Sequence, residues 1–283
     1  MVLMAACGVL LLAGVVLVVR WGGRTVASPP EPVESGEGGS FSLAARRYAW
    51  RLTVAVVAGV GAGLLVAGAG GRLIMRLLAV TADDSAVGRR TEAEEIVGQI
   101  TTGGTLSFVL FTALFFGLAS GLAYMVVQRW LPPGRLGGLA FGALLLVIAA
   151  TTIEPLRADN ADFDLVGPGW LAAAAFGALV VLHGMLVATL AARYGDGLPL
   201  LSTKRRSLLA HGPLLVFLPV FPAAIALIVL GAVGYGLSRV RGVAAAVASQ
   251  RSFVAGRLAL VVVAVVALPF AAIDIADIAG RHP

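Results

Sequence analysis

The chain has 283 residues, of which 59% are hydrophobic and only 13% are charged. A soluble domain is about 45–50% apolar and about 25% charged, so this composition excludes an ordinary water-soluble globular protein and favours one solvated by lipid. The net charge is +6, but no basic stripe with interleaved aromatic residues accompanies it. We therefore expect no nucleic-acid binding.

Seven apolar stretches are long enough to cross a bilayer, which takes about 20 mostly apolar residues. They are residues 2–19, 52–71, 105–127, 137–153, 170–192, 208–237 and 253–273. Each is a continuous run without the alternation of barrel strands, and lipid admits only helices or closed barrels. The expected fold class is therefore all-α, a polytopic helical membrane bundle of about seven transmembrane helices.

The chain is predicted to have three regions. Residues 1–20 form an N-terminal membrane anchor helix, because Arg20 follows the apolar run and no basic residue precedes it, the reverse of a signal peptide. Residues 21–45 are rich in Pro, Gly, Ser and Glu, which indicates a flexible cytoplasmic linker. Residues 46–283 form a six-segment transmembrane bundle.

Loop charges predict the orientation, with the N-terminus outside and the more basic loops inside. One segment leaves the count open. If 208–237 spans, Arg239 falls outside and Asp274 inside, and both placements are unusual. If the segment is instead re-entrant and broken near Pro219 and Pro222, the last helix reverses and both anomalies vanish. Its length favours a span, and hence seven crossings.

Glycines recur four residues apart, as in Gly59 and Gly63 and again in Gly117 and Gly121. Small residues at this spacing flatten one helix face and allow another backbone to approach closely. We expect these faces to pack inside the bundle, and a homodimer face is the alternative.

Arg72 and Arg76 lie on one helix face at the outer end of the second apolar stretch. Desolvated charges need partners. Candidate partners are Asp83, Asp84, Glu92, Glu94, Glu95 and Glu154. In the structural interpretation, the two arginines form salt bridges that hold the outer loop or bind lipid phosphates. In the functional interpretation, they form an anion or substrate site at the outer mouth together with Glu94, Glu95 and Glu154.

His183 lies well inside a predicted span, and an intramembrane ionisable residue is a functional candidate. The alternative is a neutral imidazole bonded to a neighbouring carbonyl. His211 is expected roughly 9 Å from it in depth, which argues against a bis-histidine haem.

Cys7 is the single cysteine, and no P-loop, HExxH, GxSxG or CxxC motif occurs. We expect no cofactor, no metal site and no catalytic residue.

Three classes of function remain. A structural or accessory subunit is favoured because no motif carries chemistry. Its expected partners are the lipid bilayer and a membrane protein or a second copy of the chain. The alternative is a small transporter or channel with an anion or substrate site at the outer mouth. A membrane enzyme is least favoured, because no clustered nucleophile or acid–base pair is recognised.

The abundance of Ala, Gly, Val and Arg indicates a bacterium, so the expected location is the cytoplasmic (inner) membrane.

Overall fold

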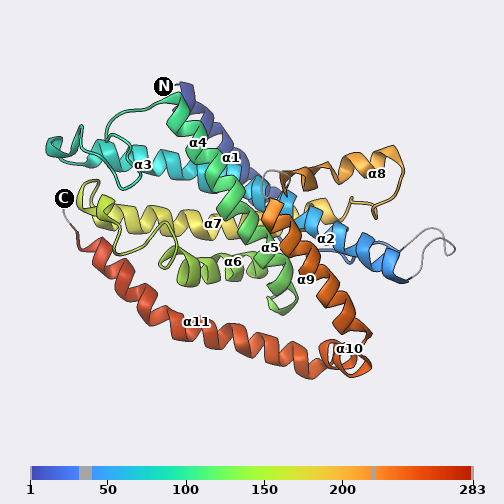
Figure 1. The fold of residues 1–283 in the computed structure, drawn as a ribbon. Coiled ribbons are helices and arrows are strands. Elements are labelled where there is room, and N and C mark those ends of the chain that lie inside the picture. Colours follow the sequence, from blue (N-terminus) through green and yellow to red (C-terminus); the bar gives the residue numbers. More distant parts are fainter. Residues whose placement is uncertain (1, 32–39, 218–220, 282–283) are drawn as a thin grey trace.

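The computed structural model describes residues 2–31, 40–217 and 221–281, and its regular structure is helical (Figure 1). Helices make up 77% of it, and these ranges contain no strand. The expected all-α fold is confirmed. Five helices are long and apolar enough to cross a membrane, namely Val2–Trp21, Ser42–Thr81, Thr102–Trp130, Gly169–Gly195 and Gln250–Ala279. The count of seven spans is not confirmed.

The elements include α-helices, three π-helical turns (η1, η3, η5) and four 3-10 turns (η2, η4, η6, η7). In chain order they are α1 (Val2–Trp21), α2 (Ser40–Ala62), η1 (Gly63–Gly68), α3 (Ala69–Thr81), η2 (Asp84–Ala86), α4 (Thr102–Thr112), η3 (Ala113–Gly117), α5 (Leu118–Val127), η4 (Gln128–Trp130), α6 (Arg135–Leu144), η5 (Leu145–Ala150), η6 (Ala161–Asp164), α7 (Gly169–Gly195), α8 (Arg205–Ala210), η7 (Gly212–Phe217), α9 (Phe221–Arg239), α10 (Arg241–Ala248) and α11 (Gln250–Ala279).

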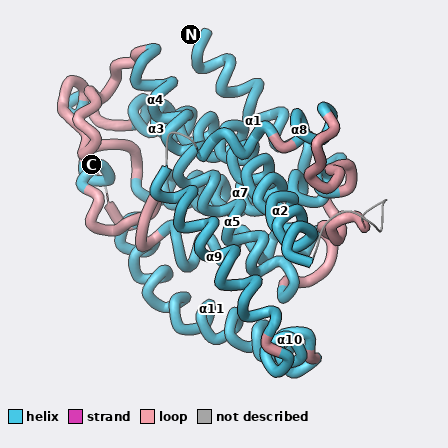
Figure 2. Tube along the Cα trace, turned by 45° about the vertical axis from the view of Figure 1, so that its right-hand side comes forward, coloured by secondary structure: helices cyan, strands magenta, loops and turns pink. Residues whose placement is uncertain are grey.

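Helix α7 runs through the middle of the bundle and contacts α1, α2, α3, α5, α6 and α11 (Figures 1 and 2). It is rich in small and aliphatic residues, and half of its most apolar window is buried. Helix α11 lies along the outside (Figure 1), with only 6% of its window buried. An apolar helix exposed to this extent is compatible with a position against lipid.

Glycines bring α2 and α5 into backbone contact. An added Cβ on Gly59 would lie 2.1 Å from the Gly117 carbonyl oxygen, and one on Gly121 would lie 2.1 Å from the Ala55 carbonyl oxygen. Only glycine fits at such distances. The small-residue faces therefore pack within the bundle, as the first of the two interpretations predicted.

One end of the bundle, which we call the acidic end, consists of the loops 82–101 and 151–168. These loops touch, because the Glu92 amide donates a 2.7 Å hydrogen bond to Asp162. Met4 lines a cavity with residues of both loops, so the first turn of α1 lies at this end as well.

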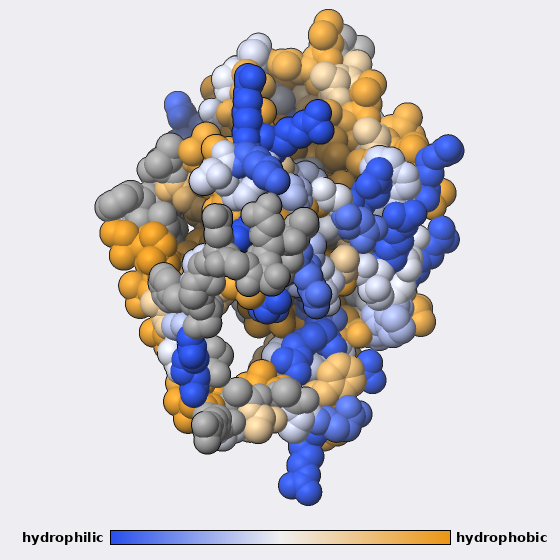
Figure 3. All heavy atoms as spheres, turned by 90° about the vertical axis from the view of Figure 1, so that its right-hand side faces the viewer, coloured by the Kyte–Doolittle hydropathy of each residue, from blue (hydrophilic) through white to orange (hydrophobic). Residues whose placement is uncertain are grey.

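The opposite end, which we call the basic end, consists of the segments that follow α1, α5 and α7 and precede α2. Arg24 pairs there with Asp196 at 3.2 Å, and Arg46 donates to the Leu201 carbonyl. Figure 3 looks at this side and shows hydrophilic side chains spread across it, bordered by apolar ones.

Residues 208–237 do not form the single spanning helix that their length predicted. Helix α8 ends at Ala210, the turn η7 follows, and α9 begins at Phe221. Pro222 accounts for part of the break, since proline lacks an N–H and is favoured in the first turn of a helix. Pro219, the other expected break point, lies outside the described residues.

This broken segment leaves the basic end and returns to it. The Tyr194 hydroxyl donates a 2.7 Å hydrogen bond to the Ala210 carbonyl near its start. Beyond α9, Arg129 in the turn η4 donates to the Val247 carbonyl at 3.1 Å. The interpretation of 208–237 as one crossing is therefore not supported.

Helix α11 consequently runs in the direction opposite to that expected from seven crossings. At its start, Arg257 donates to the Trp130 carbonyl at 3.2 Å. At its end, the Gly169 amide donates to the Arg281 carbonyl at 3.1 Å. Asp277 pairs with Arg281 at 2.7 Å and lies at the acidic end, where the re-entrant alternative placed it.

The division into anchor, linker and bundle remains a prediction, with two additions. Helix α1 packs on α3 and α7, and a Cβ on Gly14 would lie 2.8 Å from Val66, so this helix belongs to the packed bundle. Helix α2 begins at Ser40, within the predicted linker 21–45. Residues 32–39 of that linker lie outside the described residues.

Candidate functional site

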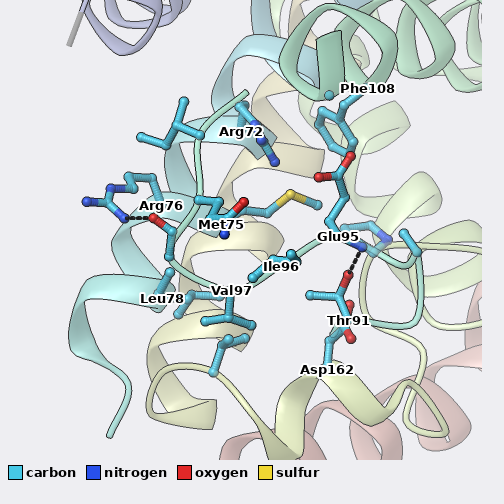
Figure 4. A pocket seen from close by; sticks show the side chains of 18 of the residues that line it. Arg72, Met75, Arg76, Leu78, Thr91, Glu95, Ile96, Val97, Phe108 and Asp162 are labelled. Carbon is cyan, nitrogen blue, oxygen red and sulfur yellow. Dashed lines mark hydrogen bonds between the residues drawn. The ribbon is translucent and has the colours of Figure 1, made fainter. Parts of the chain in front are cut away.

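A cavity of about 450 Å³ lies at the acidic end between α1, α3, α4 and the two loops (Figure 4). Its volume falls in the range of small-molecule sites. Four of the six residues proposed from the sequence line it, namely Arg72, Arg76, Glu95 and Glu154. Glu94 and His183 do not.

Two helix faces form opposite walls of this cavity. On α3 the wall contains Arg72, Met75 and Arg76, and on α4 it contains Gly104, Ser107, Phe108 and Phe111. Each set is spaced three and four residues apart, which places its members on one side of a helix. Helical periodicity therefore explains which residues of α3 and α4 line the cavity.

Neither arginine in the cavity forms an ion pair with any described residue. Arg72 donates from Nε to the Thr105 hydroxyl at 3.2 Å. Arg76 donates to the Gly98 carbonyl at 3.5 Å, which is a long and weak contact. A guanidinium has five N–H donors, so both groups retain donors for a ligand. The predicted salt bridges from these arginines to loop acids are absent among the described residues.

The loop acids have other partners. Glu92 accepts from Arg157 at 2.6 and 2.8 Å, and Glu94 pairs with Arg90 at 3.1 Å. Glu94 is exposed, has a positive φ of 61°, and does not line the cavity. Glu154 also lies 3.9 Å from Arg157, so three of the six candidate partners pair with arginines of the loops themselves.

Glu95 lies against the first turn of α4. A Cβ on Gly104 would lie 2.7 Å from the Glu95 Oε1, so the absence of a side chain at Gly104 makes room for the carboxylate. Thr101 caps the same helix by accepting from the Gly104 amide at 3.0 Å. Negative charge is stabilised at a helix N-terminus, which explains why the Glu95 carboxylate is held here without an arginine partner.

Glu154 sits half-buried on the cavity wall. Burial raises the pKa of the Glu154 carboxyl above its usual value, and the Arg157 guanidinium at 3.9 Å opposes that rise. Burial likewise raises the pKa of Asp162, although the hydrogen bond from the Glu92 amide opposes it. The cavity therefore contains two carboxyl groups that hold protons more tightly than exposed ones.

His183 is a buried packing residue in α7, remote from the cavity lining. Its Nε2 lies 2.8 Å from the Ser120 hydroxyl, and that hydroxyl donates to the Gly117 carbonyl at 2.8 Å. Because the hydroxyl donates its one proton to that carbonyl, it can only accept from the imidazole. The imidazole Nε2–H is therefore assigned as the donor to Ser120. The hydrogen-bond partner is thus a hydroxyl and not the expected carbonyl, and both interpretations of His183 remain predictions.

Sequence reasoning missed the residues of α1 and α4 that complete the cavity. Met4, Thr105, Phe108 and Phe111 were treated as parts of apolar spans. One signal was present, since Thr105 and Ser107 form a polar patch at the start of the third apolar stretch. No comparable signal in the sequence identified Met4.

The described residues contain no group of three or more His, Cys, Asp or Glu arranged to hold a metal ion. Comparison with protein-family models, curated proteins and solved structures finds no match to this chain.

Proposed function

We propose that this chain is a polytopic protein of the bacterial cytoplasmic membrane that binds a ligand through its anionic group in the cavity at the acidic end. One observation carries the proposal: Arg72 projects into that cavity (Figure 4) and has no carboxylate partner among the described residues. Arg76 lies at the edge of the same cavity. Two arginines four residues apart suit a phosphate or carboxylate, which a guanidinium can bind bidentately.

The charge balance supports binding over a purely structural role. Arg72 is half-buried, and partial desolvation of a guanidinium without a counter-charge has a cost. A salt bridge to the loop would remove that cost, but Glu94 pairs with Arg90 and Glu92 pairs with Arg157 instead. A bound anion would supply the missing counter-charge.

Six crossings fit the proposal: the five long helices and the shorter Arg135–Ala150, with both termini outside. In this arrangement most basic residues lie inside, as the positive-inside rule expects. Those at the acidic end are Arg72, Arg76, Arg89, Arg90, Arg157 and Arg281. The cavity would then open toward the outer face of the membrane.

The role of structural or accessory subunit remains a prediction, together with a membrane protein partner or homo-oligomer. A protein that co-purifies in stoichiometric amount in mild detergent would favour it.

The proposal is tested by isothermal titration calorimetry of the detergent-purified protein with O-phosphoethanolamine. The change is Arg72→Gln, and the matched control is Arg89→Gln, an exposed arginine of the same end outside the cavity. A charge-assisted hydrogen bond contributes about 1.5–3 kcal/mol, so R72Q should weaken binding about tenfold or more. R89Q should bind like the unmodified protein. Equal affinity of R72Q and the unmodified protein, or no binding by either, would refute the proposal.

A further inference from the structure

The cavity contains cationic and anionic side chains that do not pair with one another. Arg72 and Glu95 both line it, and neither belongs to an ion pair among the described residues. Figure 4 shows both side chains pointing toward the same space, one from α3 and one from the loop before α4. A ligand with negative charge alone would be attracted by Arg72 and repelled by Glu95. Charge complementarity therefore favours a zwitterionic ligand group.

The other acidic residues of the cavity have partners within the loops. Glu154 lies 3.9 Å from Arg157, and Asp162 accepts the 2.7 Å hydrogen bond from the Glu92 amide. Glu95 is the carboxylate that remains available to a ligand cation.

Away from the loops, the cavity wall becomes apolar. Met4, Met75, Phe108 and Phe111 line it there. A Cβ on Gly71 would lie 3.2 Å from the Phe108 ring, so the missing side chain lets this ring pack against the α3 backbone immediately before Arg72. A small hydrophilic ligand would leave this apolar part unfilled, whereas a hydrocarbon chain would bury it.

The apolar part reaches the outer surface of the helix bundle. Phe111 is 51% exposed although it lines the cavity, and it lies about 10 Å along α4 from Gly104. Its ring stacks on Phe115 with a 4.5 Å centroid separation, and Phe115 is also exposed. In a membrane, the surface at this depth is covered by lipid, so a chain can extend from the cavity into the bilayer.

Arg72 lies at the depth in the bilayer that is expected of lipid phosphates. The helical stretch from Arg51 to Arg72 is about 31 Å long at a rise of about 1.5 Å per residue. A bilayer hydrocarbon core is about 30 Å thick. The two arginines thus bracket one apolar crossing, and Arg72 is placed to meet a headgroup.

Resting on the proposed function, we infer that the ligand is a zwitterionic, phosphate-bearing amphiphile from the surrounding bilayer. Its phosphate binds Arg72, with Arg76 at the edge of the cavity, and its ammonium binds Glu95. Its acyl chain lies along Phe108 and Phe111 and leaves the protein beside α4. A phosphoethanolamine headgroup on a lipid chain has this chemistry.

The test compares three probes on the purified protein in detergent: lysophosphatidylethanolamine, lysophosphatidylglycerol with the same chain, and O-phosphoethanolamine without a chain. Native mass spectrometry measures binding of the two lipids, and calorimetry measures binding of the soluble headgroup.

The unmodified protein should bind the ethanolamine lipid about tenfold more tightly than the glycerol lipid. Glu95→Gln should abolish that preference, whereas the matched control Glu94→Gln, next to it but outside the cavity, should retain it. Phe111→Ser should weaken binding of both lipids but leave the affinity for O-phosphoethanolamine unchanged.

The outcomes separate this inference from the proposed function. Equal affinity for the two lipids, with binding still lost in Arg72→Gln, overturns the zwitterionic ligand but leaves anion binding in place. O-phosphoethanolamine binding as tightly as the ethanolamine lipid overturns the amphiphile. If no probe depends on Arg72, the proposed function itself fails. If R72Q does not elute as a monodisperse species, E95Q still tests the inference. Its selectivity is the ratio of its affinities for the two lipids, and that ratio is measured on E95Q alone.

Discussion

At the residue scale, the acidic end holds two kinds of charged group. Arg157 and Arg281 are surrounded by acids and fix the loops, Arg157 with Glu92 and Arg281 with Asp164 and Asp277. The first arginines after the apolar run, at positions 72 and 76, lack such partners. The sequence predicted that this pair shares a helix face. Which acids pair with which arginines depended on loop conformation, for which the sequence carries no periodic signal.

Glu154 gives a pH-dependent prediction. Its pKa is raised by burial, so the folded protein holds this proton more tightly than the unfolded chain. The stabilisation is present at pH values below the carboxyl's usual pKa and is lost as the pH rises through the raised value. Glu154→Gln cannot ionise, so it should unfold at a higher temperature than the unmodified protein at neutral pH. The difference should disappear on acidification.

This shift is measured by thermal unfolding in detergent across mildly acidic to neutral pH. Glu94→Gln, an exposed carboxylate of the neighbouring loop, serves as the control and should follow the unmodified protein throughout. A lower unfolding temperature of E154Q at neutral pH would show that the contact with Arg157 outweighs burial.

At the scale of elements, the long apolar runs predicted helices, and most of them are helices. Composition could not predict the π-helical turns η1, η3 and η5, because a π turn depends on how helices pack where they cross. It also could not decide whether 208–237 spans, since length favoured one helix while proline favoured a break. In the structure, the break occurs.

The contact between α2 and α5 gives a prediction about packing. Gly121→Ala would place a Cβ 2.1 Å from the Ala55 carbonyl oxygen, so the two helices must separate. Overpacking of this kind typically costs about 1–3 kcal/mol, and we expect a clear drop in the thermal unfolding temperature in detergent. Gly234→Ala in α9, where an added Cβ meets nothing within 4 Å, should leave that temperature unchanged or slightly higher. An unaffected G121A would show that these helices do not approach so closely.

At the scale of the whole molecule, the loop charges contained the signal for the direction of the last helix. The unusual sides assigned to Arg239 and Asp274 argued for a reversed last helix, and the length of 208–237 argued against it. Contacts such as that of Arg281 with Asp164 place the end of α11 at the acidic end. Local hydropathy could not reveal this, because it does not report which helix ends meet.

The proposed six crossings predict the side of the C-terminus. Alkaline phosphatase, which is active only outside the cytoplasm, should be active when fused after Pro283. A fusion after Lys204, at the basic end, should be inactive, whereas a green fluorescent protein fused there should fluoresce. The reverse pattern at Pro283 would restore an odd number of crossings.

The central claim is that Arg72 holds a phosphate-bearing amphiphile in the cavity of the acidic end. Its most direct test is mass spectrometry of the lipids that remain on the protein after purification from native membranes in mild detergent. The unmodified protein and Arg89→Gln should retain one zwitterionic phospholipid class enriched over its share of the membrane, and Arg72→Gln should lose that enrichment. Identical lipid profiles for all three proteins would contradict the claim.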